Sequence, residues 1–417
     1  MPAAAPPPRI VTLVLVDRAG TLLGALPPFQ AETPWWQDFG PVVHAVRDRH
    51  GLAVTLLRFL EAERPCAPGG AVTYLGEVDR VDVAAVPLRA WSGRLRDHPL
   101  RLPWARPGGP RADLDWARAE LAAQGIAIEG LPEQVRSWNL SSLWRLPTSH
   151  GHAWLKAVPP FLAHEGAVLR LLQGQGVPRL LAHDGHRVLL AEVPGEDRYD
   201  AGGVELPAMV DALVALQARW ISRIDALEAA GMTDWRADAL AGRFDDALQR
   251  HGADLDPADV DALRRLRAQW PALWAEVQAC GLPDTLVHGD AFPGNFRRRT
   301  DDPAAPPVLL DWGDSGIGHP LLDQAAFLDR IAPADVPAVR AHWSAAWQRA
   351  CPGCDPERAA ALLAPIVALV KACVYRRFLD GIEPDEHPYH RDDVPDWLRR
   401  AAAACRARGD RAVRPAA

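Results

Sequence analysis

The hydrophobic positions in the first part of the chain fall into short runs that are separated by turn residues. Two short strands are predicted within residues 10–30, joined by a turn at 17–20 where Asp and Gly are typical turn formers. Apolar residues then recur at helical spacing over 40–50, and this pattern stops at Gly51. Two more strands are predicted after this helix, at 52–60 and 71–78.

A change of pattern near residue 128 divides the chain. A stretch rich in Pro and Gly at 103–110 and a helical stretch at 115–124 precede it, so we expect a small α+β domain over 1–128. Strands and one helix then predict a small β-rich domain over 129–195. Residues 196–417 are predominantly helical, with helices predicted at 206–230, 236–250, 257–280, 334–350 and 356–380.

One non-helical insert at 286–323 contains the residues that are most suggestive of chemistry. It begins with the triplet 288–290, His-Gly-Asp, and Asn295 follows its Asp by five positions; a strand, a turn and a second strand then end at Asp311. Phosphoryl transfer needs a carboxylate that orients the attacking hydroxyl and oxygen ligands for a magnesium ion that neutralises the phosphates. We predict that Asp290 has the first role and that Asn295 and Asp311 hold Mg²⁺.

A lysine and a glutamate lie upstream at positions that suit phosphate binding. Lys156 stands in a predicted strand, where a charged group is costly unless it has a partner or a ligand. Glu165 lies at the start of the next helix and could pair with it. Taken alone, the two residues also fit a surface lysine and an acid that favours a helix N-terminus. Their order with the HxDxxxxN and D-aromatic-G segments matches the signature set of protein kinases.

The segment from about 130 to 400 resembles the aminoglycoside phosphotransferase branch of the kinase-like superfamily. Members carry HGD in place of HRD and often have a G-x-P-x-x-D segment after the magnesium Asp, as residues 318–323 do here. The resemblance implies a bilobal α+β fold with a small β-rich N-lobe and a helical C-lobe. It also implies that Asp290 is the catalytic base, that ATP and Mg²⁺ are cofactors, and that His288 and Asp323 support the catalytic loop.

The same resemblance implies a nucleotide site. Lys156 would hold the α- and β-phosphates and Glu165 would position it, while residues 190–193 would form the hinge beside the adenine, with Glu192 and Val193 as its contacts. No GxGxxG segment precedes the lysine. The equivalent turn would be near residues 139–142, where the phosphate contacts would come from Ser141 and Ser142.

The N-terminal domain resembles a Nudix fold in its layout, especially over residues 34–55. Nudix hydrolases hold magnesium with a glutamate-rich helix. Aligned on its glycine, this chain has His44, Ala45, Asp48 and Arg49 at the four positions of that motif. One carboxylate is too few for a divalent-metal site, so we expect a non-catalytic module and no nucleotide diphosphate hydrolysis.

Two features of the C-terminal part have more than one interpretation. Lys371 stands in an apolar helical stretch, where a buried ion pair, a side chain that reaches the surface, and a contact with substrate are all reasonable roles. The acidic stretch 380–396 favours a cationic acceptor such as an amino sugar, and it fits a solvated acidic surface equally well.

Composition narrows the partners. The net charge of -7 and the pI near 6.1 argue against a nucleic-acid binder, which usually has a basic face. We expect no membrane segment and no signal peptide, and therefore a cytoplasmic location. Only two of the 46 basic residues are lysine, Lys156 and Lys371, and only two residues are asparagine, Asn139 and Asn295, which suggests that chemistry requires some of them.

We therefore expect an ATP- and Mg²⁺-dependent phosphotransferase that acts on a hydroxyl group of a small molecule. The alternative is a kinase-like regulatory protein that binds nucleotide or ligand without turnover. Degenerate kinases commonly lose one of their active-site residues, whereas this chain keeps Lys156, Asp290, Asn295 and Asp311. A sugar, an amino sugar, a choline-like alcohol and a hydroxyl-bearing amino acid are all compatible acceptors, and the sequence sets no oligomeric state.

Overall fold

The computed structural model describes residues 6–84, 86–298 and 305–413, and these residues form two compact units. The first unit contains 1–166, 180–192 and 378–391, and the second contains 167–179, 193–377 and 392–417. A short segment near the C-terminus thus belongs to the first unit. The sequence pattern did not predict this return of the chain.

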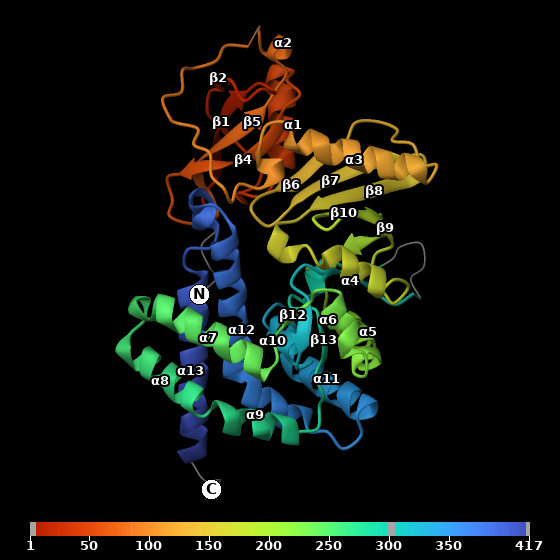
Figure 1. The fold of residues 1–417 in the computed structure, drawn as a ribbon, viewed down its shortest axis with the longest axis vertical. Coiled ribbons are helices and arrows are strands. Elements are labelled where there is room, and N and C mark those ends of the chain that lie inside the picture. The colour runs from red at the N-terminus through yellow and green to blue at the C-terminus, as the bar shows by residue number, and fades with distance from the viewer. Residues whose placement is uncertain (1–5, 85, 299–304, 414–417) are drawn as a thin grey trace. The chain divides into compact units, whose positions relative to one another are not determined.

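The first unit begins with a five-stranded sheet in the order β2-β1-β5-β4, with β3 paired to the other end of β1 (Figure 1). β1 and β5 are parallel and the other pairs are antiparallel. The strands are β1 Arg9–Val16, β2 Leu22–Ala25, β3 Phe29–Gln30, β4 Thr55–Ala62 and β5 Gly70–Glu77. Helix α1, Gly40–His50, ends at Gly51 in the left-handed conformation (φ 66°), as the sequence predicts.

Alternation along β1 explains why this sheet has a core on each face. Val11, Leu13 and Leu15 pack in the cluster that also contains the buried side of α1, whereas Val14 and Val16 pack in a second cluster. Because successive side chains of a strand point to opposite faces, an uninterrupted apolar strand must be covered on both sides. A short helix, α2 (Arg80–Val83), follows β5.

A second, fully antiparallel sheet follows, in the order β6-β7-β8-β10-β9. Its strands are β6 Glu133–Ser137, β7 Ser142–Thr148, β8 Gly151–Ala157, β9 Leu180–His183 and β10 Arg187–Ala191. Helix α3, Gly109–Ala123, lies along one face and buries Ala117 and Leu121 against Trp144 and Leu155 (Figure 1). α3 therefore packs with this sheet although it precedes the boundary predicted at 128.

The two sheets of the first unit are joined at β6. The side-chain amide of Gln134 accepts a hydrogen bond from the Leu56 N–H (2.9 Å) and donates one to the Leu56 carbonyl (2.7 Å). The N–H of Ser137 donates to the Gln37 carbonyl at 3.2 Å. These bonds satisfy buried polar groups along a strand edge that would otherwise be open.

The returning segment consists of the end of α12 (Pro356–Gly381) and the 3₁₀ helix η5 (Pro384–Tyr389). Its Tyr389 contacts the rings of Trp36, Phe59 and Trp138 at centroid distances of 5.6, 5.6 and 5.7 Å. The side-chain amide of Asn139 donates to the Glu386 carbonyl at 3.3 Å. The segment thus fastens the first sheet to the β6–β7 turn of the second.

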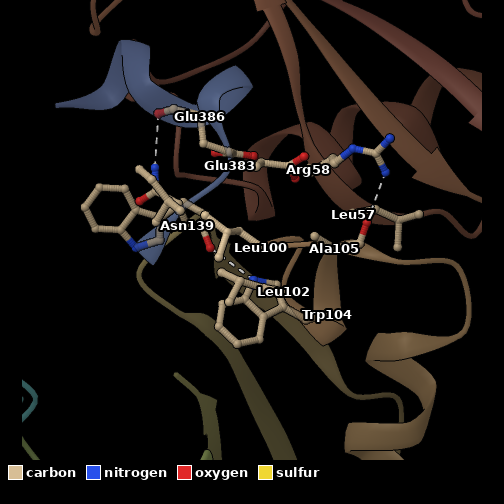
Figure 2. A pocket seen from close by; sticks show the side chains of 11 residues that line it. Leu57, Arg58, Leu100, Leu102, Trp104, Ala105, Asn139, Glu383 and Glu386 are labelled. Atoms are coloured by element: carbon tan, nitrogen blue, oxygen red, sulfur yellow. Dashed lines mark hydrogen bonds between the residues drawn. The ribbon is translucent and has the colours of Figure 1, made fainter. Parts of the chain in front are cut away.

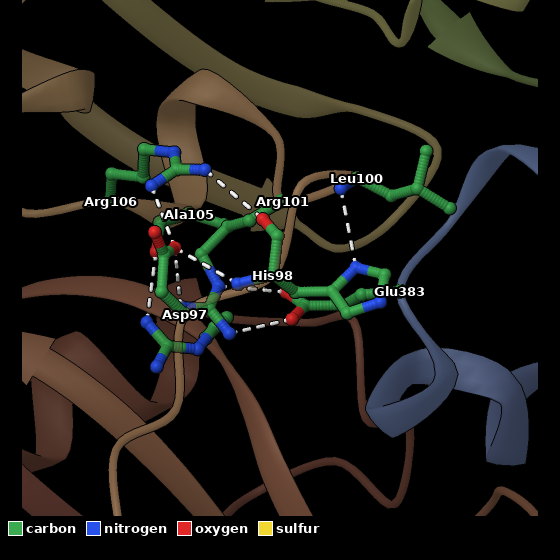
Figure 3. A network of polar contacts seen from close by, with 8 residues as sticks. Asp97, His98, Leu100, Arg101, Ala105, Arg106 and Glu383 are labelled. Carbon is green, nitrogen blue, oxygen red and sulfur yellow. Dashed lines mark hydrogen bonds and ion pairs between the residues drawn. The ribbon is translucent and has the colours of Figure 1, made fainter.

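Buried charged side chains lie beside this joint, which is the contact of the returning segment with the two sheets. Arg101 makes a two-pronged contact with Glu383, with Nε–Oε1 and Nη2–Oε2 distances of 3.0 and 2.6 Å, and both side chains are buried. Asp97 and Arg106 extend the network to the surface (Figure 3). Arg58 and Glu386 line a cavity of about 10 Å³ beside it, which has room for about one water molecule (Figure 2).

The second unit is mainly helical. Its helices are α5 Glu205–Trp220, α6 Ile224–Ala229, α7 Ala237–His251, α8 Pro257–Ala268, α9 Trp270–Ala279, α10 Leu322–Leu328, α11 Val336–Ala350, most of α12, and α13 Asp393–Val413; α4, Glu165–Leu171, begins in the first unit. The helix predicted at 257–280 is divided into α8 and α9 because Pro271 stands at the start of the second helix. α13 was not predicted.

Two small sheets lie among these helices. One has the order β11-β14-β15, with β11 Glu196–Asp197, β14 Phe296–Arg298 and β15 Val308–Leu309; the other has the order β12-β16-β13, with β12 Thr233–Asp234, β13 Thr285–Val287 and β16 Gly316–Gly318. The turn that the sequence predicts between β14 and β15 lies largely outside the described residues. These strands carry the insert that the sequence marks as the candidate site.

Helix α12 is long and apolar enough to cross a membrane by length and composition alone. Of its most apolar window, 61% is buried within the protein, and Ile366, Leu369 and Ala372 are completely buried. This burial is typical of a helix in a protein core.

Replacement of Arg101 by Leu should destabilise the first unit strongly. It would leave the carboxylate of Glu383 buried without its cation, which typically costs about 3–5 kcal/mol. Denaturant unfolding measures the cost. Arg118→Leu is the control, because Arg118 pairs with Asp115 on the exposed surface of α3 at 2.6 Å and such pairs are worth about 0–1 kcal/mol. Equal costs for the two variants would contradict the role of the buried pair.

Glu386 should make stability depend on pH. Burial raises the pKa of its carboxyl to about 8, with neighbouring Glu383 in the same direction and Arg58 opposing it. Between about pH 4.5 and pH 8 the folded state therefore holds a proton that the unfolded state has lost, so stability falls as the pH rises. Glu386→Gln should match the parent at pH 4 and exceed it at pH 8 by at least about 1 kcal/mol. If the variant and the parent protein had equal unfolding free energies at both pH values, the role of Glu386 would be refuted.

Candidate active site

The candidate catalytic loop joins β13 to β14 in the second unit. Its Gly289 has φ 87°, and a Cβ there would stand 2.2 Å from the carbonyl oxygen of Asp314. Only glycine fits this position, because it combines a left-handed backbone with a close approach of another chain segment. The glycine of the HGD triplet is therefore a requirement of the loop's shape.

A buried carboxylate holds the loop. Asp323 is completely buried and accepts hydrogen bonds from the N–H groups of His288 and Gly289, both at 2.8 Å. The side-chain amide of Gln217, on α5, donates to the same carboxylate at 2.9 Å. Burial raises the pKa of Asp323 to about 6, and the two N–H donors oppose that rise. The final Asp of the 318–323 segment thus has the supporting role that the resemblance implies.

The histidine of the triplet is a neutral structural group. Burial lowers the pKa of His288, and its Nε2 lies 2.9 Å from the Leu310 carbonyl. Its Nδ1 accepts the N–H of Asp290 at 3.3 Å, so the proton is on Nε2. The ring also packs against Trp312 in an edge-to-face arrangement, with 4.6 Å between the ring centroids. His288 therefore ties the loop to the strand that leads to Asp311.

Asp290 and Asn295 lie together at the loop's open side. The amide Nδ2 of Asn295 donates to the Asp290 carbonyl at 2.9 Å and lies 3.4 Å from its Oδ2. Asn295 is only 9% exposed, whereas the side chain of Asp290 is 35% exposed. The carboxylate is thus held from within and remains accessible to a substrate.

Asp311 has an unusual backbone. Its φ is 61°, the only positive value for a non-glycine residue among the described residues. Such a conformation costs about 1–3 kcal/mol and is concentrated at functional sites. The N–H of Leu310 donates to the Asn295 carbonyl at 2.8 Å, which links the segments that carry the two predicted magnesium ligands.

The donor set suits magnesium bound together with phosphate. Carboxylate and amide oxygens are the ligands that Mg²⁺ prefers, and it commonly takes only one or two carboxylates plus substrate phosphates. Within the described residues, no group of three or more His, Cys, Asp or Glu side chains is arranged as a complete metal site. Asn295 and Asp311 fit a site that a nucleotide would complete. Oδ1 of Asp314 lies 3.5 Å from Nη2 of Arg377, and burial raises the pKa of the Asp314 carboxyl.

The predicted phosphate lysine lies in the first unit, on β8. Its Nζ is 2.8 Å from Oε1 of Glu165, and the two side chains are 13% and 1% exposed. The predicted contact is therefore present, despite a separation of only nine residues. A buried carboxylate with a buried ammonium forms a preorganised pair that neutralises the charge of both groups. Their role toward a nucleotide stays a prediction.

The predicted phosphate-covering turn is the β6–β7 turn. Ser142 is 1% exposed, and its hydroxyl accepts a hydrogen bond from Nε1 of Trp144 at 3.2 Å. The hydroxyl of Ser141 accepts one from Nε1 of Trp138 at 3.3 Å. Both hydroxyls thus have partners inside the protein. Contacts with phosphate, which remain predicted, would fall mainly to the backbone.

The predicted hinge coincides with a passage between units. The chain leaves the first unit after Glu192 and enters the second at Val193. The carboxylate of Glu192 contacts Arg145 at 3.2 Å and His152 at 3.0 Å. Because its side chain is occupied in this way, a contact of Glu192 with adenine would come from its backbone.

A cavity of about 450 Å³ opens beside Asp290 in the second unit. Helix α10 with the turn after it, helix α12 and helix α13 contribute the other lining residues: Ala326, Asp329, Arg330, Lys371, Tyr375, Asp393, Asp396, Trp397 and Arg400. The volume suits a small molecule. The sequence did not identify this wall, because α13 was not predicted and side chains from three distant helices form it.

The acidic stretch 380–396 is divided between two places. Asp393 and Asp396 line the cavity, whereas Glu383 and Glu386 are buried in the joint of the first unit. The cavity also contains Arg330 and Arg400. The stretch is therefore neither a continuous acidic surface nor a continuous acceptor wall.

Lys371 is a residue for which the sequence left several roles open. Its Nζ lies 2.8 Å from the Gly289 carbonyl and 3.1 Å from Oδ1 of Asp290. Lys371 thus forms an ion pair with a partly exposed carboxylate, and because it also lines the cavity, its contact with substrate stays a prediction. The scarcity of lysine in the chain was the sequence signal that suggested a chemical role for Lys371.

Residues 136–362 match the model of the phosphotransferase enzyme family, and this span is more than half of the chain. The chain belongs to this family. The kinase-like, mixed α+β fold that the resemblance implies is thereby confirmed. The Nudix-like layout of the N-terminal domain stays a prediction. No curated protein matches the chain.

Several solved structures are similar to this chain at low sequence identity. A macrolide 2'-phosphotransferase from Brachybacterium faecium is 19% identical with a TM-score of 0.46, over 70% of this chain and 98% of its own. A GDP complex of aminoglycoside 2'-phosphotransferase-IIIa is 16% identical with a TM-score of 0.49, over 71% of this chain and 99% of its own. A choline kinase from Streptococcus pneumoniae is 12% identical with a TM-score of 0.49, over 70% of this chain and 99% of its own.

Proposed function

We propose that this protein transfers the γ-phosphoryl group of ATP to a hydroxyl group of a small molecule, with Mg²⁺ as cofactor. The observation that carries the proposal is the geometry of Asp290. The carboxylate is fixed by Asn295 and Lys371, it is partly exposed, and it faces a cavity large enough for a small molecule. A positioned base beside an acceptor cavity is what transfer to a hydroxyl requires.

Asp290 would orient the acceptor hydroxyl and receive its proton as the phosphoryl group transfers in line. Asn295 and Asp311 would hold Mg²⁺, which supplies positive charge to the phosphate oxygens. Lys156, fixed by Glu165, would bind the α- and β-phosphates. The backbone of the β6–β7 turn, including Ser141 and Ser142, would cover the phosphates.

The backbone at Glu192 and Val193 would contact the adenine. We propose the division that the sequence predicts, with an N-terminal module over 1–128, an N-lobe over 129–195 and a C-lobe over 196–417, in a cytoplasmic protein. Within it, α3 packs on the sheet of the N-lobe and residues 378–391 belong to the first compact unit. The N-terminal module would be Nudix-like and non-catalytic. In support, Asp48 on α1 is exposed and lies 3.7 Å from Arg47, while His44 lies 3.5 Å from Glu133.

Asp290→Asn should lower kcat by about 10²–10⁴-fold, because it removes the base while keeping the shape of the side chain. ADP release with a sugar, an amino sugar, a choline-like alcohol and a hydroxyl-bearing amino acid measures turnover. ATP binding should be nearly unchanged.

The control for this variant is Asp245→Asn, because Asp245 pairs with Arg267 at 2.7 Å on the exposed surface of the second unit. It should keep full activity. Full activity of Asp290→Asn would exclude Asp290 as the base. Binding of ATP with no turnover of any acceptor by the parent protein would favour the regulatory alternative.

A further inference from the structure

Lys371 makes two contacts with the catalytic loop from a different element. It stands in the second half of α12, and its side chain is only 14% exposed. One contact is with the backbone carbonyl of Gly289 and the other with the carboxylate of Asp290, at 2.8 and 3.1 Å. An ammonium group bound to two oxygens of adjacent residues fixes both the loop and the orientation of the carboxylate.

The choice of lysine at this position is informative. The chain uses arginine for all but two of its 46 basic residues, yet it has lysine here. A compact ammonium can donate to a carbonyl and a carboxylate that lie close together, whereas a planar guanidinium is larger and donates as a rigid fork. The ammonium has three N–H donors, and the two contacts use two of them.

Several carboxylates lie near Lys371. Burial raises the pKa of Asp314, Asp290 and Asp311 act in the same direction, and Lys371 and Arg377 oppose the rise, so the ammonium acts electrostatically on these carboxylates. Without it, the negative charge around the loop would oppose the transfer of a negatively charged phosphoryl group to a hydroxyl beside Asp290. The cation therefore lies where negative charge must be balanced for phosphoryl transfer.

We propose that Lys371 is a positioning residue that holds the carboxylate of Asp290 toward the acceptor hydroxyl and balances the charge at the point of transfer. This inference rests on the proposed function. It goes beyond it because turnover would depend on a residue of α12, outside both the HGD loop and the Lys156–Glu165 pair.

The test compares Lys371→Met, Lys371→Arg and Lys371→Ala with the parent protein. Lys371→Met should lower kcat by about 100-fold with KM for ATP changed less than about threefold, because the lysine acts on the transferring group rather than on nucleotide binding. Lys371→Arg should recover only part of the loss. Methylammonium should restore the Lys371→Ala variant at least about tenfold in a saturable manner, since it supplies the missing cation.

The control is Arg358→Met on the same helix. Arg358 is exposed and pairs with Glu276 at 3.2 Å, so its replacement removes a positive charge without touching the loop; activity should be unchanged.

Three outcomes would overturn the inference. If Lys371→Met kept the parent kcat while Asp290→Asn was inactive, the proposed function would stand and Lys371 would have no part in it. If the loss in Lys371→Ala followed its thermal destabilisation and methylammonium restored nothing, the contact would be structural only. If the parent protein phosphorylated no acceptor, the proposed function would fail and this inference with it.

Discussion

The candidate site depends on one buried carboxylate. Asp323 accepts the backbone N–H groups of His288 and Gly289, and this requires that the loop turn sharply at a glycine with a left-handed backbone. A carboxylate that is completely buried is costly unless N–H donors satisfy it. The bonds therefore hold the loop and stabilise the acid at the same time, and the exposed Asp290 follows at a fixed position.

Around that loop, the polar contacts come from helix α12 and from the turn that follows the loop. Lys371 comes from α12, Asn295 from the following turn, and Arg377 from the last part of α12 in the second unit. In the first unit, Lys156 and Glu165 form a pair of their own. Asp290, Asp314 and Glu165 thus each have a cation in the unit where they lie. This arrangement favours a preformed site, in which little free energy is needed to order side chains when substrate binds.

Local patterns predicted much of the fold and of the site. Helical spacing and Gly51 located α1, and the order of Lys156, Glu165, Asp290, Asn295 and Asp311 predicted a kinase-like fold that the family match confirms. The Lys156–Glu165 contact was predicted from the placement of a charged lysine in a strand and a glutamate at the start of the following α-helix.

Contacts between distant segments were not predictable in this way. Arg101 and Glu383 are separated by 282 residues, and no periodicity in either segment indicates the other. Lys371 and Asp290 are 81 residues apart, and α13, which supplies one wall of the cavity, begins in an acidic segment with a proline at 395 that resembles a loop. The positive φ of Asp311 is likewise set by the surrounding structure, since aspartate alone rarely adopts it.

The central claim is that these residues bind a nucleotide together with magnesium. The most direct test is the thermal midpoint of the purified protein with and without ATP and Mg²⁺, beside Lys156→Ala and Asp311→Ala, because a ligand that binds only the folded state raises the midpoint. The account predicts a magnesium-dependent rise in the parent protein that is absent or much smaller in both variants. No rise in the parent, or an equal rise in all three proteins, would contradict it.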